Sequence, residues 1–202
     1  MTELPRDFVA QQIRDAISVH QSMLDNKELI AEIEAVAELI VKTYRSGGKV
    51  LIAGNGGSAA DSQHIAAELV SRFSLERSAL PAMALTTDTS IMTAISNDYG
   101  YDNVFSRQLE ASARPGDVFI AISTSGNSPN ILRALASAGE LGVISVGMTG
   151  ATGGQMVALC RHCLRVPATA TPRIQEGHAT IGHILCASAE RALFAGDRPA
   201  GT

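Results

Sequence analysis

The chain has 202 residues, of which 46% are hydrophobic and 18% charged, and its formal net charge is −4. This length and apolar content predict a single domain, residues 1–202, with a substantial core. The sequence has no cluster of basic residues, which argues against nucleic acid as a main partner. Its N-terminus lacks an unbroken apolar stretch, so we expect neither a signal peptide nor a membrane span, and therefore a cytoplasmic protein.

Two long amphipathic helices are predicted within residues 1–46. Apolar residues recur at helical spacing over residues 8–17 and again over residues 29–40, and the turn-like pair Asp25 and Asn26 separates the two runs. These apolar faces exceed what a compact helical hairpin needs for itself. We therefore expect part of them to pack against another subunit.

Beyond residue 48, short apolar runs alternate with helical segments. The runs typical of buried strands are 49–53, 82–85, 118–122, 143–147 and 163–166. The predicted helices are 58–72, 90–97, 104–113, 130–141, 155–159 and 173–194. This alternation predicts an α/β fold, in which helices cover both faces of a five-stranded parallel sheet to form a three-layer sandwich. Ligands of such folds bind beyond the carboxyl ends of the strands.

Two loops rich in glycine and hydroxyl groups follow the first and third predicted strands. Glycines let the backbone approach a ligand, while free amides at a helix start and hydroxyl groups can bind phosphate oxygens. Simple N-capping, for example by Ser58, is the alternative. The two loops consist of Gly54, Asn55, Gly56, Gly57 and Ser58, and of Ser123, Thr124, Ser125, Gly126, Asn127, Ser128 and Pro129.

The first loop also matches the dinucleotide pattern G-x-G-x-x-A through Gly54, Gly56 and Ala59. A nucleotide ribose would need an acidic residue at the end of the second strand, but Glu76 precedes that strand and Asp88 follows late. The sequence therefore does not favour an NAD enzyme.

His64 and Glu68 lie one helical turn apart in the helix that follows the first loop. Side chains four residues apart share a helix face. An imidazole and a carboxylate at this spacing can bind one divalent cation or can act as acid and base on one substrate. A surface pair on a solvated helix is the alternative.

A Cys-x-x-Cys spacing joins Cys160 and Cys163. Zinc would need two further ligands close by. Redox chemistry usually places the first cysteine at a helix N-terminus, whereas Cys160 ends an apolar helical stretch. The sequence therefore does not favour a function for this pair.

Four separated motifs, in order along nearly the whole chain, resemble the sugar isomerase (SIS) domain family, specifically its phosphoheptose isomerase type. They are GNGGSAADSQHIAAEL, TTDTSIMTAISNDYGYD, STSGNSPN and TPRIQEGHATIGHIL. The resemblance implies a flavodoxin-like fold and the conversion of sedoheptulose 7-phosphate into D-glycero-D-manno-heptose 7-phosphate. That product would supply heptose for lipopolysaccharide, capsule or another glycan. It also implies a homotetramer with active sites at subunit interfaces.

The same resemblance assigns site residues. It implies one zinc ion per subunit, held by His64, Glu68, Gln175 and His183. It implies Glu68 as the base and His183 as its acid/base partner. It places the sugar phosphate against Asn55, Gly56, Gly57, Ser58, Glu68, Arg72, Asn97, Asp98, Ser123, Thr124, Ser125, Ser128 and Gln175.

Two points qualify this assignment. A helix rises ~1.5 Å per residue, which separates Gln175 from His183 by about 12 Å. Either Gln175 precedes the regular helix, or the two ligands reach one ion across a subunit boundary. His178 lies between these two ligands in the sequence, and we interpret it as an ordinary packed or exposed helix residue. The second point is that SIS proteins resembling the bacterial replication-initiator-associating factor bind a protein partner instead. Their catalytic positions are typically replaced, so the presence of Glu68, His183 and the STSG run favours an enzyme.

Overall fold

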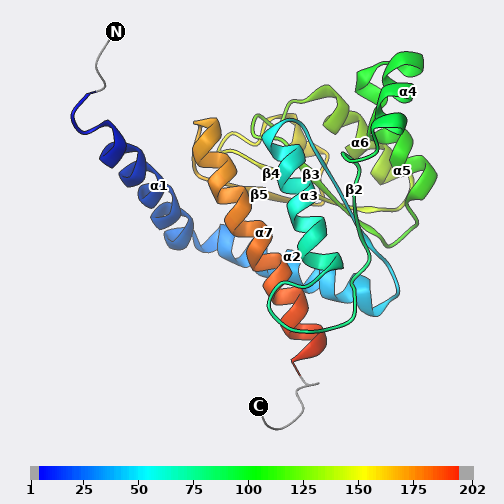
Figure 1. Ribbon diagram of the computed structural model, residues 1–202, viewed down its shortest axis with the longest axis horizontal. Helices are drawn as coiled ribbons and strands as arrows, with labels where there is room; N and C mark the ends of the chain where they lie inside the picture. Colours follow the sequence, from blue (N-terminus) through cyan, green and yellow to red (C-terminus); the bar gives the residue numbers. More distant parts are fainter. Residues whose placement is uncertain (1–4, 196–202) are drawn as a thin grey trace.

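The computed structural model describes residues 5–195 and has the predicted α/β fold (Figure 1). Its five strands form one parallel sheet in the order β2-β1-β3-β4-β5. Chain order reverses between β1 and β3, and such a switch point is where open α/β sheets bind ligands. The strands are β1 (Val50–Gly54), β2 (Ala82–Ala84), β3 (Val118–Ile122), β4 (Ile144–Thr149) and β5 (His162–Arg165).

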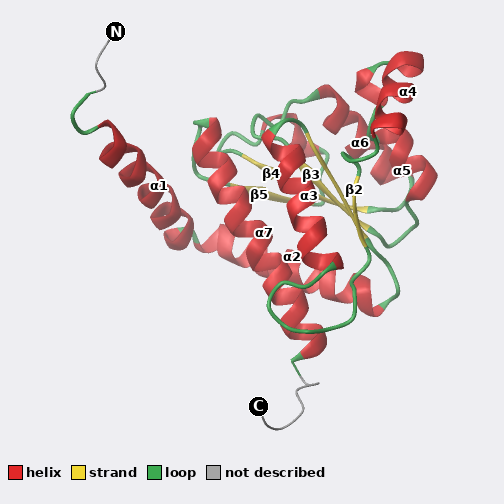
Figure 2. Ribbon diagram, in the orientation of Figure 1, coloured by secondary structure: helices red, strands yellow, loops and turns green. Residues whose placement is uncertain are grey.

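Seven α-helices and two 3₁₀ helices complete the described part of the chain (Figure 2). They are α1 (Phe8–Asp25), α2 (Lys27–Arg45), α3 (Gly57–Val70), α4 (Thr89–Tyr99), η1 (Tyr101–Asn103), α5 (Ser106–Ser112), α6 (Pro129–Glu140), η2 (Gly154–Ala158) and α7 (Thr171–Phe194). The predicted helix 155–159 is thus a short 3₁₀ turn rather than an α-helix. Gly153 and Gly154 begin it with φ of +72° and +55°, which an α-helix does not accommodate.

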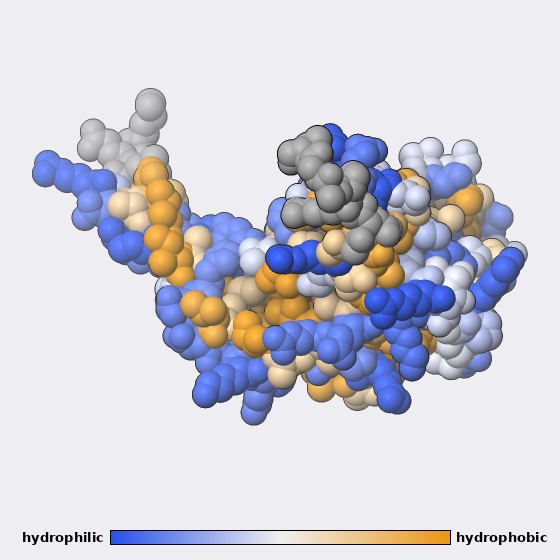
Figure 3. All heavy atoms as spheres, turned by 90° about the horizontal axis from the view of Figure 1, so that it is seen from below, coloured by the Kyte–Doolittle hydropathy of each residue, from blue (hydrophilic) through white to orange (hydrophobic). Residues whose placement is uncertain are grey.

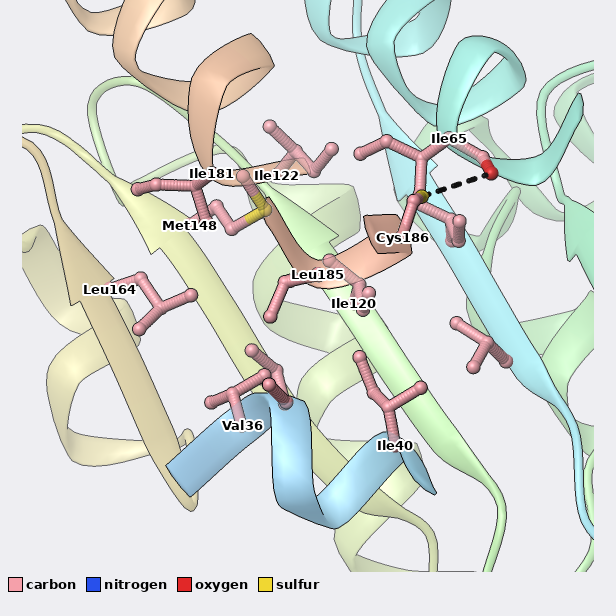
Figure 4. Packing of buried hydrophobic residues seen from close by; sticks show 14 of the residues in the cluster. Val36, Ile40, Ile65, Ile120, Ile122, Met148, Leu164, Ile181, Leu185 and Cys186 are labelled. Atoms are coloured by element: carbon pink, nitrogen blue, oxygen red, sulfur yellow. Dashed lines mark hydrogen bonds between the residues drawn. The ribbon is translucent and has the colours of Figure 1, made fainter. Parts of the chain in front are cut away.

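The sheet is the middle of three layers. Helices α2, α3 and α7 cover one face, where Ile40, Ile65 and Leu185 pack against strand residues such as Ile120 and Met148 (Figure 4). Helices α5 and α6 cover the other face. Strands β1 and β3 are buried along their whole length. These two central strands therefore hold their C-terminal loops on a rigid base.

The two N-terminal helices are present, but α1 does not fold back along α2. Only Asn26 joins them, and its side chain caps α2 by accepting a hydrogen bond from the Leu29 amide at 3.0 Å. Helix α1 instead projects from the body (Figure 1) and contacts α7, where His20 Nε2 lies 2.9 Å from Thr180 Oγ1. Met23 is the single buried residue of α1.

The projecting helix carries an apolar stripe, which we call the α1 stripe. Its residues are exposed and form an orange band along the protrusion (Figure 3). They are Phe8, Val9, Ile13, Ile17 and Leu24. Water-facing apolar area of this extent is typical of a protein-protein contact, and the contact with another subunit stays a prediction. Within residues 5–195, no helix is both long and apolar enough to traverse a lipid bilayer.

A buried ion pair that the sequence did not reveal fixes the loop after α3. Arg77 Nε lies 3.1 Å from Glu190 Oε2, and the two side chains are 1% and 3% exposed. The same carboxylate accepts hydrogen bonds of 2.7–3.0 Å from the backbone amides of Phe73, Ser74 and Leu75. Burial would raise the pKa of Glu190, but these hydrogen bonds together lower it.

Glu190→Gln should destabilise the protein by about 3–5 kcal/mol, because it leaves the Arg77 charge buried without its partner. The lowered pKa of Glu190 means that its contribution is present above the unfolded-state pKa and is lost as pH falls through the folded-state pKa. Urea unfolding at several pH values measures both effects. Glu76→Gln, at a surface carboxylate that is 88% exposed, is the control and should change stability little.

Candidate functional site

The two predicted loops meet at the switch point of the sheet. Asn55, which follows β1, and Asn130, at the start of α6, exchange two side-chain hydrogen bonds of 2.9 Å. Tyr101 Oη donates to Asn55 Oδ1 at 3.0 Å. The loops are therefore held together by side chains on three segments, and two of these residues, Tyr101 and Asn130, were not predicted from the sequence as site residues. Both lie within the quoted motifs, but no spacing rule singles them out.

The first loop turns at Gly56, the N-cap of α3, which has φ of +56°. Ser58 is not the N-cap that the sequence suggested. It lies inside α3 and is 4% exposed, and its carbonyl accepts the Ser62 hydroxyl at 2.7 Å. Gly57 is approached so closely by the Gln175 amide that a Cβ at this position would collide with it. Gln175 therefore lies beside the first loop.

The second loop gathers three hydroxyl groups. Ser123 Oγ lies 2.9 Å from Ser128 Oγ and 3.5 Å from Ser125 Oγ. Ser128 is the N-cap residue of α6, yet its side chain makes no capping bond because it faces Ser123. Thr124 uses its carbonyl to accept the Gly150 amide at 3.1 Å. Converging hydroxyls at a helix start that no side chain caps form a suitable anion cradle.

His64, Glu68 and His183 come together on the adjoining faces of α3 and α7. His64 Nε2 lies 2.8 Å from His183 Nε2 and 3.7 Å from Glu68 Oε1. The two imidazoles meet edge to face at 72°, and the Phe73 ring lies 5.7 Å from that of His183. At 2.8 Å one imidazole nitrogen carries a hydrogen and donates a hydrogen bond, which the other nitrogen accepts. The structure thus brings His183, which the resemblance implies, into contact with the pair that spacing predicts.

This cluster is open to solvent in the isolated chain. The His64 side chain is 52% exposed and that of Glu68 is 24% exposed. His183 and its neighbour Ile184, 40% exposed, also face outward. Acid-base groups are more effective when water is excluded. Their exposure therefore favours a second subunit that covers them.

The donor set bears on the proposed zinc ion. Two imidazole nitrogens and one carboxylate are ligands that zinc accepts, and here they point at one another. As positioned, residues 5–195 contain no group of three or more His, Cys, Asp and Glu side chains ready to hold a metal. Gln175 lies within the regular helix, since α7 begins at Thr171, so the first explanation of its spacing is wrong. The second, a site completed across a subunit boundary, stays a prediction.

The other predicted residues lie around this region. Asn97 donates to Asp98 at 2.8 Å near the end of α4, a helix that buries none of its residues. The two precede Tyr101, which contacts the first loop. Arg72 is exposed and pairs with Glu76 at 3.2 Å, and within residues 5–195 it makes no hydrogen bond or ion pair with another predicted site residue.

His178 is a packed residue, which is one of the two interpretations that the sequence allows. It is fully buried, and its Nε2 lies 3.2 Å from the Thr149 carbonyl. Burial lowers the pKa of His178 to about 4, against the smaller opposing effect of the carbonyl. The ring is therefore neutral at pH 7 and donates through Nε2, which makes it a structural residue of α7.

Comparison with known proteins gives consistent results. Residues 14–150 match the SIS domain family. The phosphoheptose isomerase of Aneurinibacillus thermoaerophilus is 56% identical over 188 residues, which cover 93% of this chain and 95% of that protein. Phosphoheptose isomerase 2 of Campylobacter jejuni is 53% identical, covering 93% of each. The structure of the phosphoheptose isomerase from Neisseria gonorrhoeae superposes with a TM-score of 0.86 at 41% identity, covering 92% of this chain and 98% of that one.

Proposed function

The chain belongs to the SIS domain family and, within it, to the phosphoheptose isomerases, and on that premise we propose that it converts sedoheptulose 7-phosphate into D-glycero-D-manno-heptose 7-phosphate. The observation that carries this proposal is the convergence of His64, Glu68 and His183 across α3 and α7, in a fold that also holds a hydroxyl-lined anion cradle at the start of α6. The alternative of a non-catalytic protein-binding role finds no support in these relatives, which bear the name of an enzyme. Action in the cytoplasm stays a prediction.

The site has two ends that suit the two ends of this substrate. His64 follows Gly57 by seven residues, which places it about 10 Å along α3 from the first loop, and the first loop is joined to the second through Asn55 and Asn130. The phosphate binds the loop with Ser123, Ser125 and Ser128, while the carbonyl end of the extended sugar chain reaches His64 and Glu68. Because the phosphate does not react, its binding energy orients the reacting carbons.

The isomerisation moves one proton between adjacent carbons and one between their oxygens. The Glu68 carboxylate removes the proton next to the carbonyl and returns it to the neighbouring carbon. His183 Nε2 exchanges the oxygen proton, and its contact with His64 Nε2 supplies a partner that can hold or release a hydrogen. The amides and hydroxyls of the cradle hold the substrate in place during both transfers.

His64, Glu68 and His183 would also hold the zinc ion, with Gln175 as the fourth ligand where the assembly brings it near. When bound, zinc would stabilise negative charge that develops on the substrate oxygens. A histidine that binds zinc through Nε2 cannot transfer a proton through the same atom. Zinc ligation and proton transfer by His183 are therefore separable experimentally.

A homotetramer with shared active sites is part of the proposal. It is supported by the exposed α1 stripe, by the exposure of the His-Glu cluster and by α4, which buries none of its residues. Contact with another subunit would remove each of these surfaces from water. The Gln175 amide lies near Gly57 in this chain, and a neighbouring subunit would supply the ligand if it brings its own Gln175 to the cluster.

The direct test is to incubate the purified protein with sedoheptulose 7-phosphate and to follow the aldose by NMR. We expect an aldose signal to grow until equilibrium is reached. When the reaction is run in deuterium oxide, deuterium from the solvent should appear at the carbon that receives the proton. Unphosphorylated sedoheptulose should react very poorly, because it lacks the group that binds the cradle. An absence of turnover at full zinc occupancy and in the oligomeric state would reject the function.

Ser123→Ala should raise KM about tenfold and leave kcat nearly unchanged, because this hydroxyl binds a group that does not change during the reaction. Ser125→Ala should behave alike. Steady-state kinetics measure the effect, and Ser112→Ala, at a hydroxyl that bonds to its own helix, is the matched control. A loss confined to kcat would show that Ser123 acts on the reacting end instead.

A further inference from the structure

Cys160 and Cys163 lie against the same glycine. Cys160 follows η2, and Cys163 lies in β5, the edge strand. A Cβ at Gly147 of β4 would lie 2.7 Å from Cys160 Sγ and 3.5 Å from Cys163 Sγ. The missing side chain thus leaves one space that both sulfur atoms share. Cys186, in contrast, is buried in the opposite layer, 3.9 Å from the Ile65 carbonyl (Figure 4).

Neither cysteine of the pair is fully enclosed by the protein, since each is half-buried. Cys163 lines a depression of ≈ 330 Å³ that also contains Glu28, Glu32 and Arg165. This depression offers one guanidinium and two carboxylates beside a sulfur atom, and one of these carboxylates, that of Glu32, also contacts His162 Nδ1 at 3.0 Å. A small molecule with carboxylate and ammonium groups, linked through a disulfide, complements that arrangement.

The surroundings distinguish the two sulfurs. A hydrogen bond from the Cys160 thiol lowers the pKa of Cys163, Arg165 lowers it further, and burial and Glu32 oppose them. The same hydrogen bond and burial raise the pKa of Cys160. Cys163 also lines the depression beside Arg165, whereas Cys160 does not, so Cys163 is the sulfur that meets the small molecule and attacks it. The second cysteine of the Cys-x-x-Cys pair is thus the attacking one, whereas in redox sites whose first cysteine begins a helix the first cysteine attacks.

We propose that Cys160 and Cys163 form a redox-active dithiol that a zwitterionic low-molecular-weight disulfide oxidises. The Cys163 thiolate attacks one sulfur of the small disulfide, which forms a mixed disulfide and releases one small thiolate. Cys160 then loses its proton to solvent and attacks Cys163 Sγ, which releases the second small thiolate. The protein loses two electrons and two protons, and the small disulfide gains the two electrons.

The dithiol adjoins a segment that supports the phosphate cradle. In η2 the Met156 amide donates to the Gly126 carbonyl at 3.1 Å, and the Gln155 amide donates to Asn127 Oδ1 at 3.0 Å. Cys160 follows η2 by two residues. A Cys160–Cys163 disulfide ties the end of this segment to β5. Such a cross-link reduces its local opening and thereby that of the cradle.

The test uses glutathione disulfide as the probe, on the intact oligomer, with mass spectrometry of alkylated peptides. The wild-type chain should lose two hydrogens and contain one Cys160–Cys163 disulfide. Cys160→Ser should retain a stable adduct on Cys163, because no second thiol resolves it. Cys163→Ser should react at least tenfold more slowly, and Cys186→Ser should behave as wild type. Unmodified wild-type protein, a disulfide to Cys186, or equal reaction of Cys163→Ser would each overturn the proposal.

Amide hydrogen exchange tests the link to the cradle without relying on catalysis. Oxidation of the wild-type protein should slow exchange in peptides that cover residues 154–160 and 123–128. The Cys186→Ser variant should show the same slowing, and Cys163→Ser treated in the same way should show none. Equal exchange in the oxidised and reduced wild-type protein would overturn the link to the cradle.

Discussion

Glu68→Gln should lower kcat by about two to four orders of magnitude, because the amide keeps the shape of the side chain and removes the base. KM should change much less, since the phosphate end of the substrate binds elsewhere on the protein. Glu68 Oε1 lies 3.7 Å from His64 Nε2 and makes no buried ion pair, so the substitution should leave the fold intact. Steady-state kinetics, together with thermal unfolding of the variant, measure these effects.

Because Glu68 is also a proposed zinc ligand, metal content must be measured with each rate. Glu76→Gln, at a surface carboxylate after α3, controls for the change of charge and should keep full activity. His183→Ala separates the two roles of that residue. Lost activity at full zinc occupancy identifies proton transfer, whereas lost activity with lost zinc identifies ligation. A Glu68→Gln enzyme within tenfold of wild type, with an unchanged oligomer, would exclude Glu68 as the base.

Much of the fold follows from the sequence because its signals are local. Apolar runs such as 118–122 matched strand β3 residue for residue, since a strand buried on both faces has no polar positions to blur its ends. The short segment 155–159 is a 3₁₀ turn rather than the predicted α-helix because two glycines with positive φ change its geometry. The angle between α1 and α2 was also not predictable, since it depends on contacts between α1 and α7 rather than on either helix alone.

In the candidate site, too, local spacing reveals some residues, whereas others come together only through the packing of distant segments. His64 and Glu68 were found by spacing within one helix. Their contact with His183 depends on how α3 packs against α7, which the sequence pattern does not encode, and it was reached only through a resemblance. The Arg77–Glu190 pair went unseen for the same reason: its partners are 113 residues apart, and each looks like an ordinary charged surface residue.

Ile17→Asp should dissociate the oligomer and reduce kcat/KM by roughly a hundredfold, although residue 17 lies on none of the elements that form the His-Glu cluster. Ile17 is 62% exposed and lies in the α1 stripe beside Ile13 and Leu24. A carboxylate there would have to be buried at the predicted interface without a partner. Dissociation would then leave His64 and Glu68 in water, where their acid-base action weakens. Light scattering and steady-state kinetics on the same samples measure both effects.

Ser18→Asp is the matched control, because Ser18 is the next residue of α1 and is exposed. The substitution adds the same charge as Ile17→Asp, but it does so beside the α1 stripe rather than within it. It should leave both the oligomer and the activity near wild type, so that any effect of Ile17→Asp reports the lost apolar contact and not the added carboxylate. A dissociated Ile17→Asp variant with full activity would show that one chain forms a complete site. An Ile17→Asp variant that stays oligomeric would show that the α1 stripe is not the assembling surface, and the exposed residues of α4 would then be the surface to alter.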